Sequence, residues 1–231
     1  MSKPLIIALD FDGLESTLAC VDKLDPKHCQ LKVGSELFTR CGEGLVRLLI
    51  AREFQVFLDL KFHDIPHTVA RACKAAADLG VWMLDVHVSG GLSMLEAAVK
   101  ALDSYPVMQR PLLIGVTVLT SHAPVDLQRI GVHESLQEYT CHLAQLANAT
   151  GLDGVVSAAH HVPLIKSLCG EHFIAVTPGI RMREDVHDDQ ISVATPRQAL
   201  ELGSDYLVVG RSITRALDPG LRVQDILQSC V

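Results

Sequence analysis

Short apolar runs recur at fairly even spacing along the chain, and segments with a helical pattern separate them. The runs predict eight strands, at residues 5–9, 29–33, 54–60, 81–88, 111–119, 154–158, 173–176 and 206–209. Between them, apolar side chains at three- and four-residue steps predict amphipathic helices. Two examples are the stripe of Leu92, Leu95, Val99 and Leu102 and the stripe of Leu136, Tyr139, Leu143 and Leu146.

This alternation predicts an α/β protein of the (β/α)₈ TIM-barrel class. Eight strand–helix units in 231 residues fit a closed barrel better than a doubly wound sheet, which usually has fewer strands. No GxGxxG motif follows the first run, so the sequence gives little support to a dinucleotide-binding fold. No Pro/Ser-rich linker or low-complexity stretch divides the chain, and we expect one catalytic domain over residues 1–231.

Composition narrows the partners and the compartment. The formal net charge is −7 and no Lys/Arg run is present, which argues against a nucleic-acid partner. The seven cysteines are scattered without a CxxC motif, as is typical of reduced thiols in a cytosol. The apolar stretch before Asp10 is too short for a signal peptide and no run is long enough to span a membrane, so we expect a cytoplasmic protein without a membrane partner.

Polar residues lie at or just beyond the carboxyl ends of the expected strands. In a barrel those ends converge on one mouth, where active sites are built. The residues in question are Asp10, Lys32, Asp59, Lys61, Asp85, His87, Thr117, Thr120, Thr177 and Arg211.

The most informative segment is Asp59-Leu-Lys61-Phe-His-Asp64, in which a lysine lies between carboxylates after an apolar run. In a regular strand Asp59 and Lys61 point to the same face, because side chains repeat with period two, and Asp64 then belongs to the following loop. Clustered charges cost several kcal/mol each when withdrawn from water, so they are retained mainly where chemistry needs them. A surface ion pair is the alternative for any single Asp/Lys pair.

Two segments are candidates for binding an anion. Near the end of the chain, the eighth run passes through Gly210 and Arg211 into a helix, and barrels often bind phosphate at this place. The second segment, residues 177–192, is long and polar and precedes a helix that we place near Pro196. Its length predicts a lid or binding loop in which Arg181 and Gln190 close on an anionic ligand, and a disordered surface excursion is the alternative.

The histidines do not predict a metal site. His63 and His67 have the spacing of a helical ligand pair, but Pro66 belongs in the first turn of a helix and leaves His63 outside it. His160 and His161 fit an exposed pair at a helix start. We therefore predict no bound metal.

With these motifs in hand, the chain resembles the orotidine 5′-phosphate decarboxylase family, in its bacterial form. The resemblance covers essentially the whole length and is most specific over residues 59–68. The matching segments are Ala8-Leu-Asp10, Lys32-Val-Gly34, residues 59–68, Val118-Leu-Thr120, Thr177-Pro-Gly-Ile-Arg181, Gln190 and Val209-Gly-Arg211.

The resemblance implies a homodimer of barrels that share their active sites, converting orotidine 5′-phosphate (OMP) to uridine 5′-phosphate (UMP) and CO₂. Asp59, Lys61 and Asp64 would be catalytic, with Asp64 and Thr68 reaching into the partner's site. The substrate would also be bound by Asp59, Asp64, Ile65 and Thr68. Substrate contacts would come from Asp10 and Lys32 at the ribose, from Thr120 at the pyrimidine, and from Gln190, Gly210, Arg211 and Arg181 at the phosphate.

The reaction leaves a carbanion at C6 in the plane of the ring, so its stabilisation must be electrostatic. A lysine cation at C6 can stabilise that charge and then donate the proton, which makes Lys61 the expected general acid in a reaction without a cofactor. Two alternatives remain: a Mg²⁺-dependent sugar-phosphate decarboxylase or aldolase on a related barrel, and a non-catalytic sensor of nucleotide phosphates.

Overall fold

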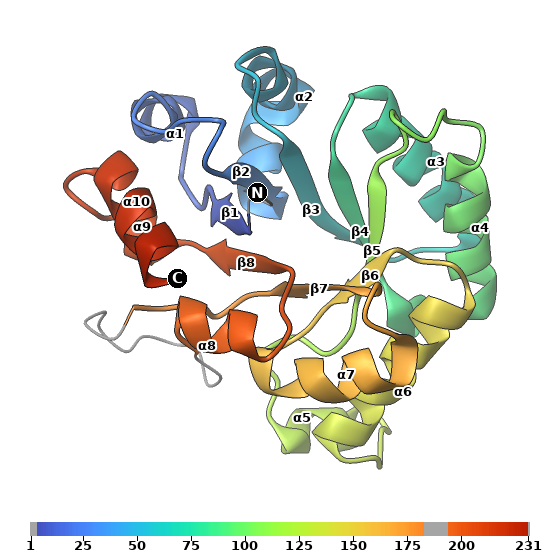
Figure 1. The fold of residues 1–231 in the computed structure, drawn as a ribbon. Helices are drawn as coiled ribbons and strands as arrows, with labels where there is room; N and C mark the ends of the chain where they lie inside the picture. The colour runs from blue at the N-terminus through green and yellow to red at the C-terminus, as the bar shows by residue number, and fades with distance from the viewer. Residues whose placement is uncertain (1–3, 183–193, 231) are drawn as a thin grey trace.

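The computed structural model describes residues 4–182 and 194–230. Eight parallel strands close into a barrel, each paired with its neighbours in the chain and the last with the first (Figure 1). This confirms the predicted (β/α)₈ barrel. The strands are β1 (Leu5–Ala8), β2 (Gln30–Gly34), β3 (Val56–Phe62), β4 (Met83–His87), β5 (Leu112–Val116), β6 (Gly154–Val156), β7 (Ile174–Thr177) and β8 (Tyr206–Val209).

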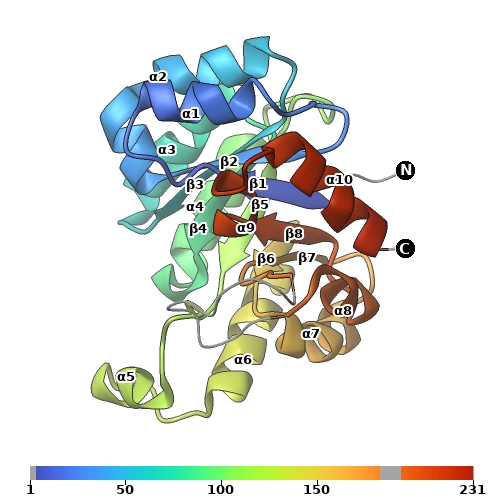
Figure 2. The same cartoon turned by 90° about the vertical axis from the view of Figure 1, so that its left-hand side faces the viewer.

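Helices surround the strands, and Figure 2 shows α1 and α2 on one side of the barrel and α6, α7 and α8 on the other. The α-helices are α1 (Leu14–Val21), α2 (Ser35–Ala51), α3 (Pro66–Asp78), α4 (Leu92–Leu102), α5 (Pro124–Arg129), α6 (Leu136–Ala149), α7 (Val162–Cys169), α8 (Pro196–Glu201), α9 (Arg211–Thr214) and α10 (Pro219–Ser229). Two short 3₁₀ turns are η1 (Val88–Gly90) and η2 (Ala159–His161). No helix of the described segments has the length and apolar character needed to cross a bilayer.

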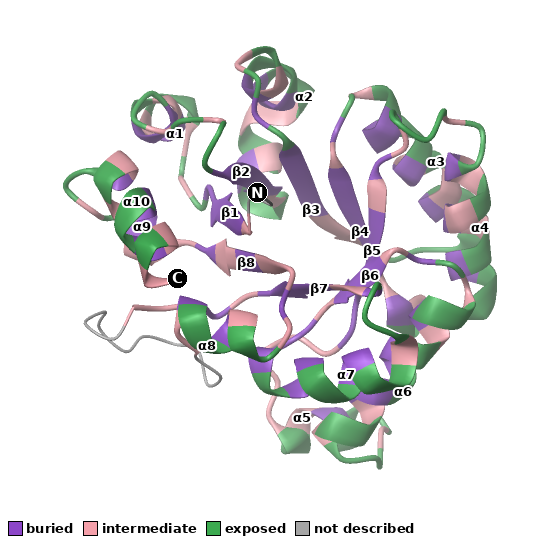
Figure 3. Cartoon of the chain, in the orientation of Figure 1, coloured by how far each residue is buried: buried purple, intermediate pink, exposed green. Residues whose placement is uncertain are grey.

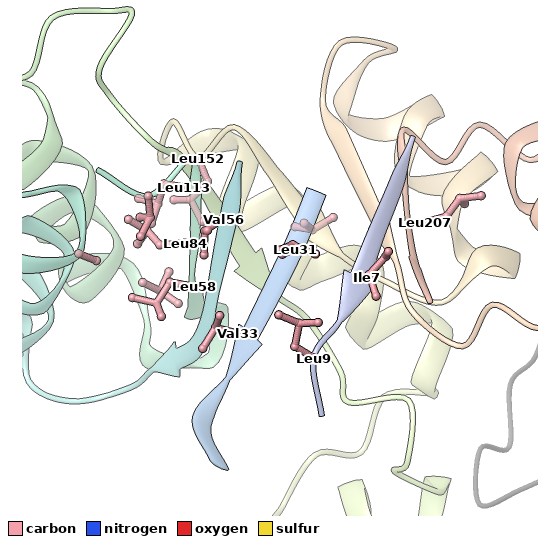
Figure 4. Close-up of a cluster of buried hydrophobic side chains, with 14 of the residues drawn as sticks. Ile7, Leu9, Leu31, Val33, Val56, Leu58, Leu84, Leu113, Leu152 and Leu207 are labelled. Atoms are coloured by element: carbon pink, nitrogen blue, oxygen red, sulfur yellow. The ribbon is translucent and has the colours of Figure 1, made fainter. Parts of the chain in front are cut away.

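Alternation along each strand separates two cores. Ile6, Phe57 and Met83 belong to a small cluster that fills the inside of the barrel. Their neighbours in sequence, such as Ile7 and Leu58, belong to the larger cluster between strands and helices, shown in Figure 4. Figure 3 shows that the strands are mostly buried, whereas the surrounding helices carry both buried and exposed residues. Alternate residues of a strand therefore face the interior of the barrel or the helices around it, and we call these two sets of positions inward and outward parity.

Strand β3 departs from regular pairing near its end. Its pairing with β4 runs through Leu58 opposite Leu84 and then resumes at Phe62 opposite Val86. Asp59, Leu60 and Lys61 thus lie opposite the single β4 residue between those pairs, and β3 bulges there. Strand β5 also differs from the expected run, because it ends at Val116 and residues 117–120 leave the sheet.

Candidate active site

A cavity of about 240 Å³ opens at the carboxyl ends of the strands. Inward-facing valines of β5 to β8 form an apolar part of its wall: Val116, Val156, Val176 and Val208. The opposite part is charged and carries Asp10, Lys32, Asp59 and Lys61, which follow or belong to β1, β2 and β3. Strand parity explains this set, because Ala8, Lys32 and Asp59 alternate with outward residues such as Ile7, Leu31 and Leu58.

The charged residues form one ion-pair network. Lys32 Nζ lies 2.9 Å from Asp59 Oδ2 and 3.5 Å from Asp10 Oδ1, and Lys61 Nζ contacts Asp59 Oδ1. Burial alone would raise the pKa of Asp59, but Lys32 and Lys61 overcome it and lower that pKa to about 2. Burial opposes the charge of Lys32 as well, and Asp59 and Asp10 more than offset it, so the pKa of Lys32 is raised. Asp59 is therefore an anion held between two cations.

The β3 bulge positions Lys61. Its backbone has a φ of 50°, in the left-handed region that non-glycine residues seldom adopt. Its N–H donates to Oδ1 of Asp85 at 2.8 Å, so a β4 side chain accepts the bond that a backbone carbonyl accepts in a regular ladder. The predicted shared face of Asp59 and Lys61 is confirmed, but an irregular strand produces it.

The far end of the cavity contains the predicted anion-binding residues. Gly210 follows β8, and Arg211 begins α9 beside it. Both line the cavity, together with Thr120 and Arg181. A Cβ atom at position 210 would lie at ordinary contact distance, 3.6 Å, from Ala8 Cβ, so Gly210 lies beside the end of the first strand. Of the predicted phosphate-binding residues, Gln190 lies outside the described residues.

Three predicted site residues do not line this cavity. Asp64, Ile65 and Thr68 are exposed around the start of α3, and the Ile65 side chain is 66% exposed. The Asp64 carboxylate accepts the Ile65 N–H at 2.6 Å. These side chains lie at the surface of the chain, where a second molecule can reach them.

Several residues at strand ends prove to be structural. Thr117 and Thr177 have outward parity and are buried. The Thr117 hydroxyl donates to the Val156 carbonyl at 2.7 Å, and the Thr177 hydroxyl lies 2.7 Å from that of Ser204. His87 packs against the His63 ring at 5.3 Å between centroids and does not line the cavity.

The expectation for the second histidine pair is partly wrong. His160 is exposed, but the His161 side chain is only 4% exposed, although both belong to η2 just before α7. Burial, with a smaller effect of His160, lowers the pKa of His161 to about 4. His161 is a neutral buried ring at ordinary pH.

The other pair behaves as its sequence predicts, since Pro66 is the first residue of α3 and His63 lies before the helix. Within residues 4–182 and 194–230, no three His, Cys, Asp or Glu side chains are grouped so that they could hold a metal ion.

Sequence reasoning missed one polar residue of this region as part of the site. Asp85 was grouped only with the strand-end residues, yet its carboxyl bonds the Lys61 backbone and it is fully buried. Its signal in the sequence was a single charge within the apolar run of residues 81–88.

Comparisons with known proteins agree on one family. Residues 3–226 match the model of the "Orotidine 5′-phosphate decarboxylase / HUMPS family". The chain is 57% identical over 228 residues to orotidine 5′-phosphate decarboxylase of Legionella pneumophila strain Paris, covering 99% of each chain. It is 55% identical over 218 residues to the enzyme of that name from Chromobacterium violaceum, covering 94% of this chain and 87% of the relative.

Solved structures give the same result for the fold. The crystal structure of orotidine 5′-phosphate decarboxylase from Lactobacillus acidophilus superimposes with a TM-score of 0.88 at 37% identity, over 99% of each chain. An uncharacterized conserved protein from Geobacillus kaustophilus gives a TM-score of 0.84 at 40% identity, over 98% of this chain and 99% of the other.

Proposed function

The chain belongs to the orotidine 5′-phosphate decarboxylase / HUMPS family, and from that premise we propose that it converts OMP to UMP and CO₂ in pyrimidine biosynthesis, without a cofactor. The observation that carries the proposal is the Lys61 ammonium on the wall of the cavity, in contact with Asp59. We assign Lys61 as the proton donor to C6 of the pyrimidine.

The chemistry demands a cation at this place. When CO₂ leaves C6, the electron pair of the broken C–C bond stays in the ring plane, where no π-system can delocalise it. A positioned ammonium group stabilises that developing charge and then transfers a proton to the same carbon. Lys61 can fill both roles, and its side chain is only 35% exposed, which limits screening by water.

Asp59 supplies the matching anion. Its pKa of about 2 keeps it ionised throughout the neutral range, so it fixes the Lys61 ammonium by charge. Lys32 balances the same carboxylate from the other side at 2.9 Å. We place the ribose hydroxyls near Lys32 and Asp10, whose side chain is 64% exposed and open to a ligand.

We place the phosphate at the other end of the cavity, at Gly210, Arg211 and Arg181. The glycine permits a close backbone approach, and the guanidinium groups match phosphate oxygens in charge and geometry. The Arg181 N–H donates to the Ala194 carbonyl at 3.0 Å, which fixes the backbone next to the cavity. Binding energy from this non-reacting group can be used for catalysis at C6. Thr120 and the valine wall remain for the pyrimidine.

We further propose that two subunits share each site. Asp64, Ile65 and Thr68 are exposed and lie outside the cavity of their own chain, so they can contribute to a site only by reaching a second copy. In a two-fold dimer such contacts are reciprocal. Asp64 would then complete the charged network of the partner.

The decisive experiment follows the loss of OMP absorbance with purified protein, with and without EDTA. We expect conversion to UMP at the same rate in both. An absence of turnover would contradict the proposal and favour the alternative function, a non-catalytic sensor of nucleotide phosphates. Turnover that EDTA abolishes would instead favour the Mg²⁺-dependent chemistry of related barrels.

A further inference from the structure

Asp85 is the most deeply buried ionisable residue beside the catalytic network. Its exposed fraction is 0%, and it shares the inward parity of Met83 on β4. One carboxyl oxygen, Oδ1, accepts the Lys61 N–H at 2.8 Å. The other, Oδ2, is buried, and no N–H or O–H group of the described residues donates to it. Asp85 also lies opposite the bulged segment that carries Asp59, and the two carboxyl groups interact.

An ionised Asp85 would be poorly accommodated here. A buried carboxylate with one oxygen unbonded lacks the compensation that buried charges need. Two ionised carboxylates cannot hydrogen-bond each other, because both are acceptors, whereas a protonated one supplies the missing O–H donor. The charges also balance without it, since Lys32 and Lys61 already match Asp59 and Asp10.

We propose that Asp85 is a positioning residue that keeps its proton at neutral pH, accepts the Lys61 N–H on one oxygen and donates its O–H to the Asp59 carboxylate. A single neutral side chain would then fix both halves of the Asp59–Lys61 pair. It holds the left-handed backbone of Lys61 across the β3 bulge, and it orients the carboxylate against which the Lys61 ammonium rests. Its effect on turnover rests on the proposed function, whereas its protonation does not.

The charged and titratable groups that face Asp85 agree with this assignment. Burial, followed by the charge of Asp59 and their hydrogen bond, raises the pKa of Asp85 well above its ordinary value, and Lys61 opposes the shift only in part. From β2, Lys32 interacts with Asp85 at longer range. From α3, the Cys73 thiol has its pKa raised to about 12 by burial and by Asp85, so it contributes no charge.

The direct test is the infrared difference spectrum between the wild-type protein and Asp85→Asn at neutral pH. We expect the wild type to show a carboxylic-acid C=O band that the variant lacks. Asp153→Asn is the matched control: Asp153 also accepts a strand N–H, that of Leu113 at 2.7 Å, but it pairs with the Arg110 guanidinium at 3.0 Å. That substitution should remove only carboxylate bands. If Asp85→Asn also removes only carboxylate bands, the proposal is wrong, whatever the enzyme's activity.

Kinetics test the positioning role. Asp85→Asn keeps an acceptor for Lys61 and a donor for Asp59, so kcat should stay within a few-fold of wild type with the same pH profile. Asp85→Ala removes both bonds and should lower kcat by about 10²-fold with little change in KM, because a small misplacement of reacting groups has that effect. A kcat for Asp85→Asn as low as expected for Asp85→Ala would mean that the negative charge is needed. A wild-type kcat for Asp85→Ala would remove the positioning role.

If Asp85→Ala does not fold, the infrared spectrum still decides the protonation state of Asp85, and a large fall in kcat for Asp85→Asn would still contradict a neutral positioning residue. A protein in which Asp85 is merely structural would lose thermal stability on Asp85→Ala without a change in kcat per folded molecule. That pattern would overturn the role in turnover and leave the protonation state to the spectrum.

Discussion

Replacing Asp85 with asparagine should change how the free energy of unfolding depends on pH. In the folded chain the pKa of Asp85 is raised by burial and by Asp59. In the unfolded chain the same carboxyl has an ordinary pKa of about 3.9. Between these values the folded protein holds a proton that the unfolded chain releases, so a rise in pH stabilises the unfolded state of the wild type. Asparagine does not titrate, and the variant lacks this effect.

The size of the effect follows from linkage. One proton bound only in the folded state costs about 1.4 kcal/mol of stability for each unit of pH. If Asp85 keeps its proton throughout, then between about pH 5 and about pH 7 the wild type should lose about 2.7 kcal/mol relative to Asp85→Asn. Any constant difference between the two side chains cancels, because only the change with pH is compared.

Urea unfolding of both proteins at several pH values, at one protein concentration, measures this gap. We expect it to widen steadily in favour of the variant as pH rises. The Asp153→Asn control removes a carboxylate that is paired with Arg110, and its gap should not widen. A constant gap for Asp85→Asn across the range would refute the reasoning, because it would mean that Asp85 is ionised in the folded protein.

Further predictions concern the proposed reaction and the barrel itself. Lys61→Ala should lower kcat by about 10²–10⁴-fold or more while the circular dichroism spectrum stays unchanged. A variant that retained a tenth of normal activity would disprove the assigned role. Arg211→Ala should raise KM for OMP but hardly affect the poor reaction of orotidine without its phosphate; an equal loss on both substrates would place Arg211 elsewhere. Mixed Lys61→Ala and Asp64→Ala subunits should regain up to half the normal activity per heterodimer. If mass spectrometry verifies subunit exchange and no activity returns, Asp64 acts in the site of its own chain. Gly154→Ala should destabilise the fold by more than about 1 kcal/mol, because its Cβ would overlap the Ile174 carbonyl, whereas Gly44→Ala on α2 meets open space and should not; equal urea midpoints for the two would contradict this packing argument.

The strands were predictable because a buried parallel barrel needs continuous apolar runs, and each of the eight runs overlaps an observed strand. Which polar residues enter the site depends on parity as well as on position at a strand end. Lys32 and Asp59 have inward parity, whereas Thr117 and Thr177 have outward parity, and the expected list did not separate them.

Other features could not be read from the sequence. The β3 bulge leaves no clear mark in an apolar run. The shared face of Asp59 and Lys61 was predicted from the two-residue repeat of a regular strand, but β3 is irregular at this point. The role of Asp85 beside Lys61 became apparent only from its complete burial in the structure, which the sequence does not show. The burial of His161 depends on packing around η2, which the local pattern of two adjacent histidines does not reveal.

The pairing of β1 with β8 has a consequence for the order of synthesis. Ile7 lies opposite Val209, so the first and last strands meet at the cavity, where Ala8 and Gly210 both line the wall. A chain emerging from the ribosome therefore contains Asp10 well before β8 has been made and the cavity can close. A nascent or truncated chain that ends before Tyr206 lacks β8 and cannot close the barrel, so the whole cavity forms only after β8 has been made.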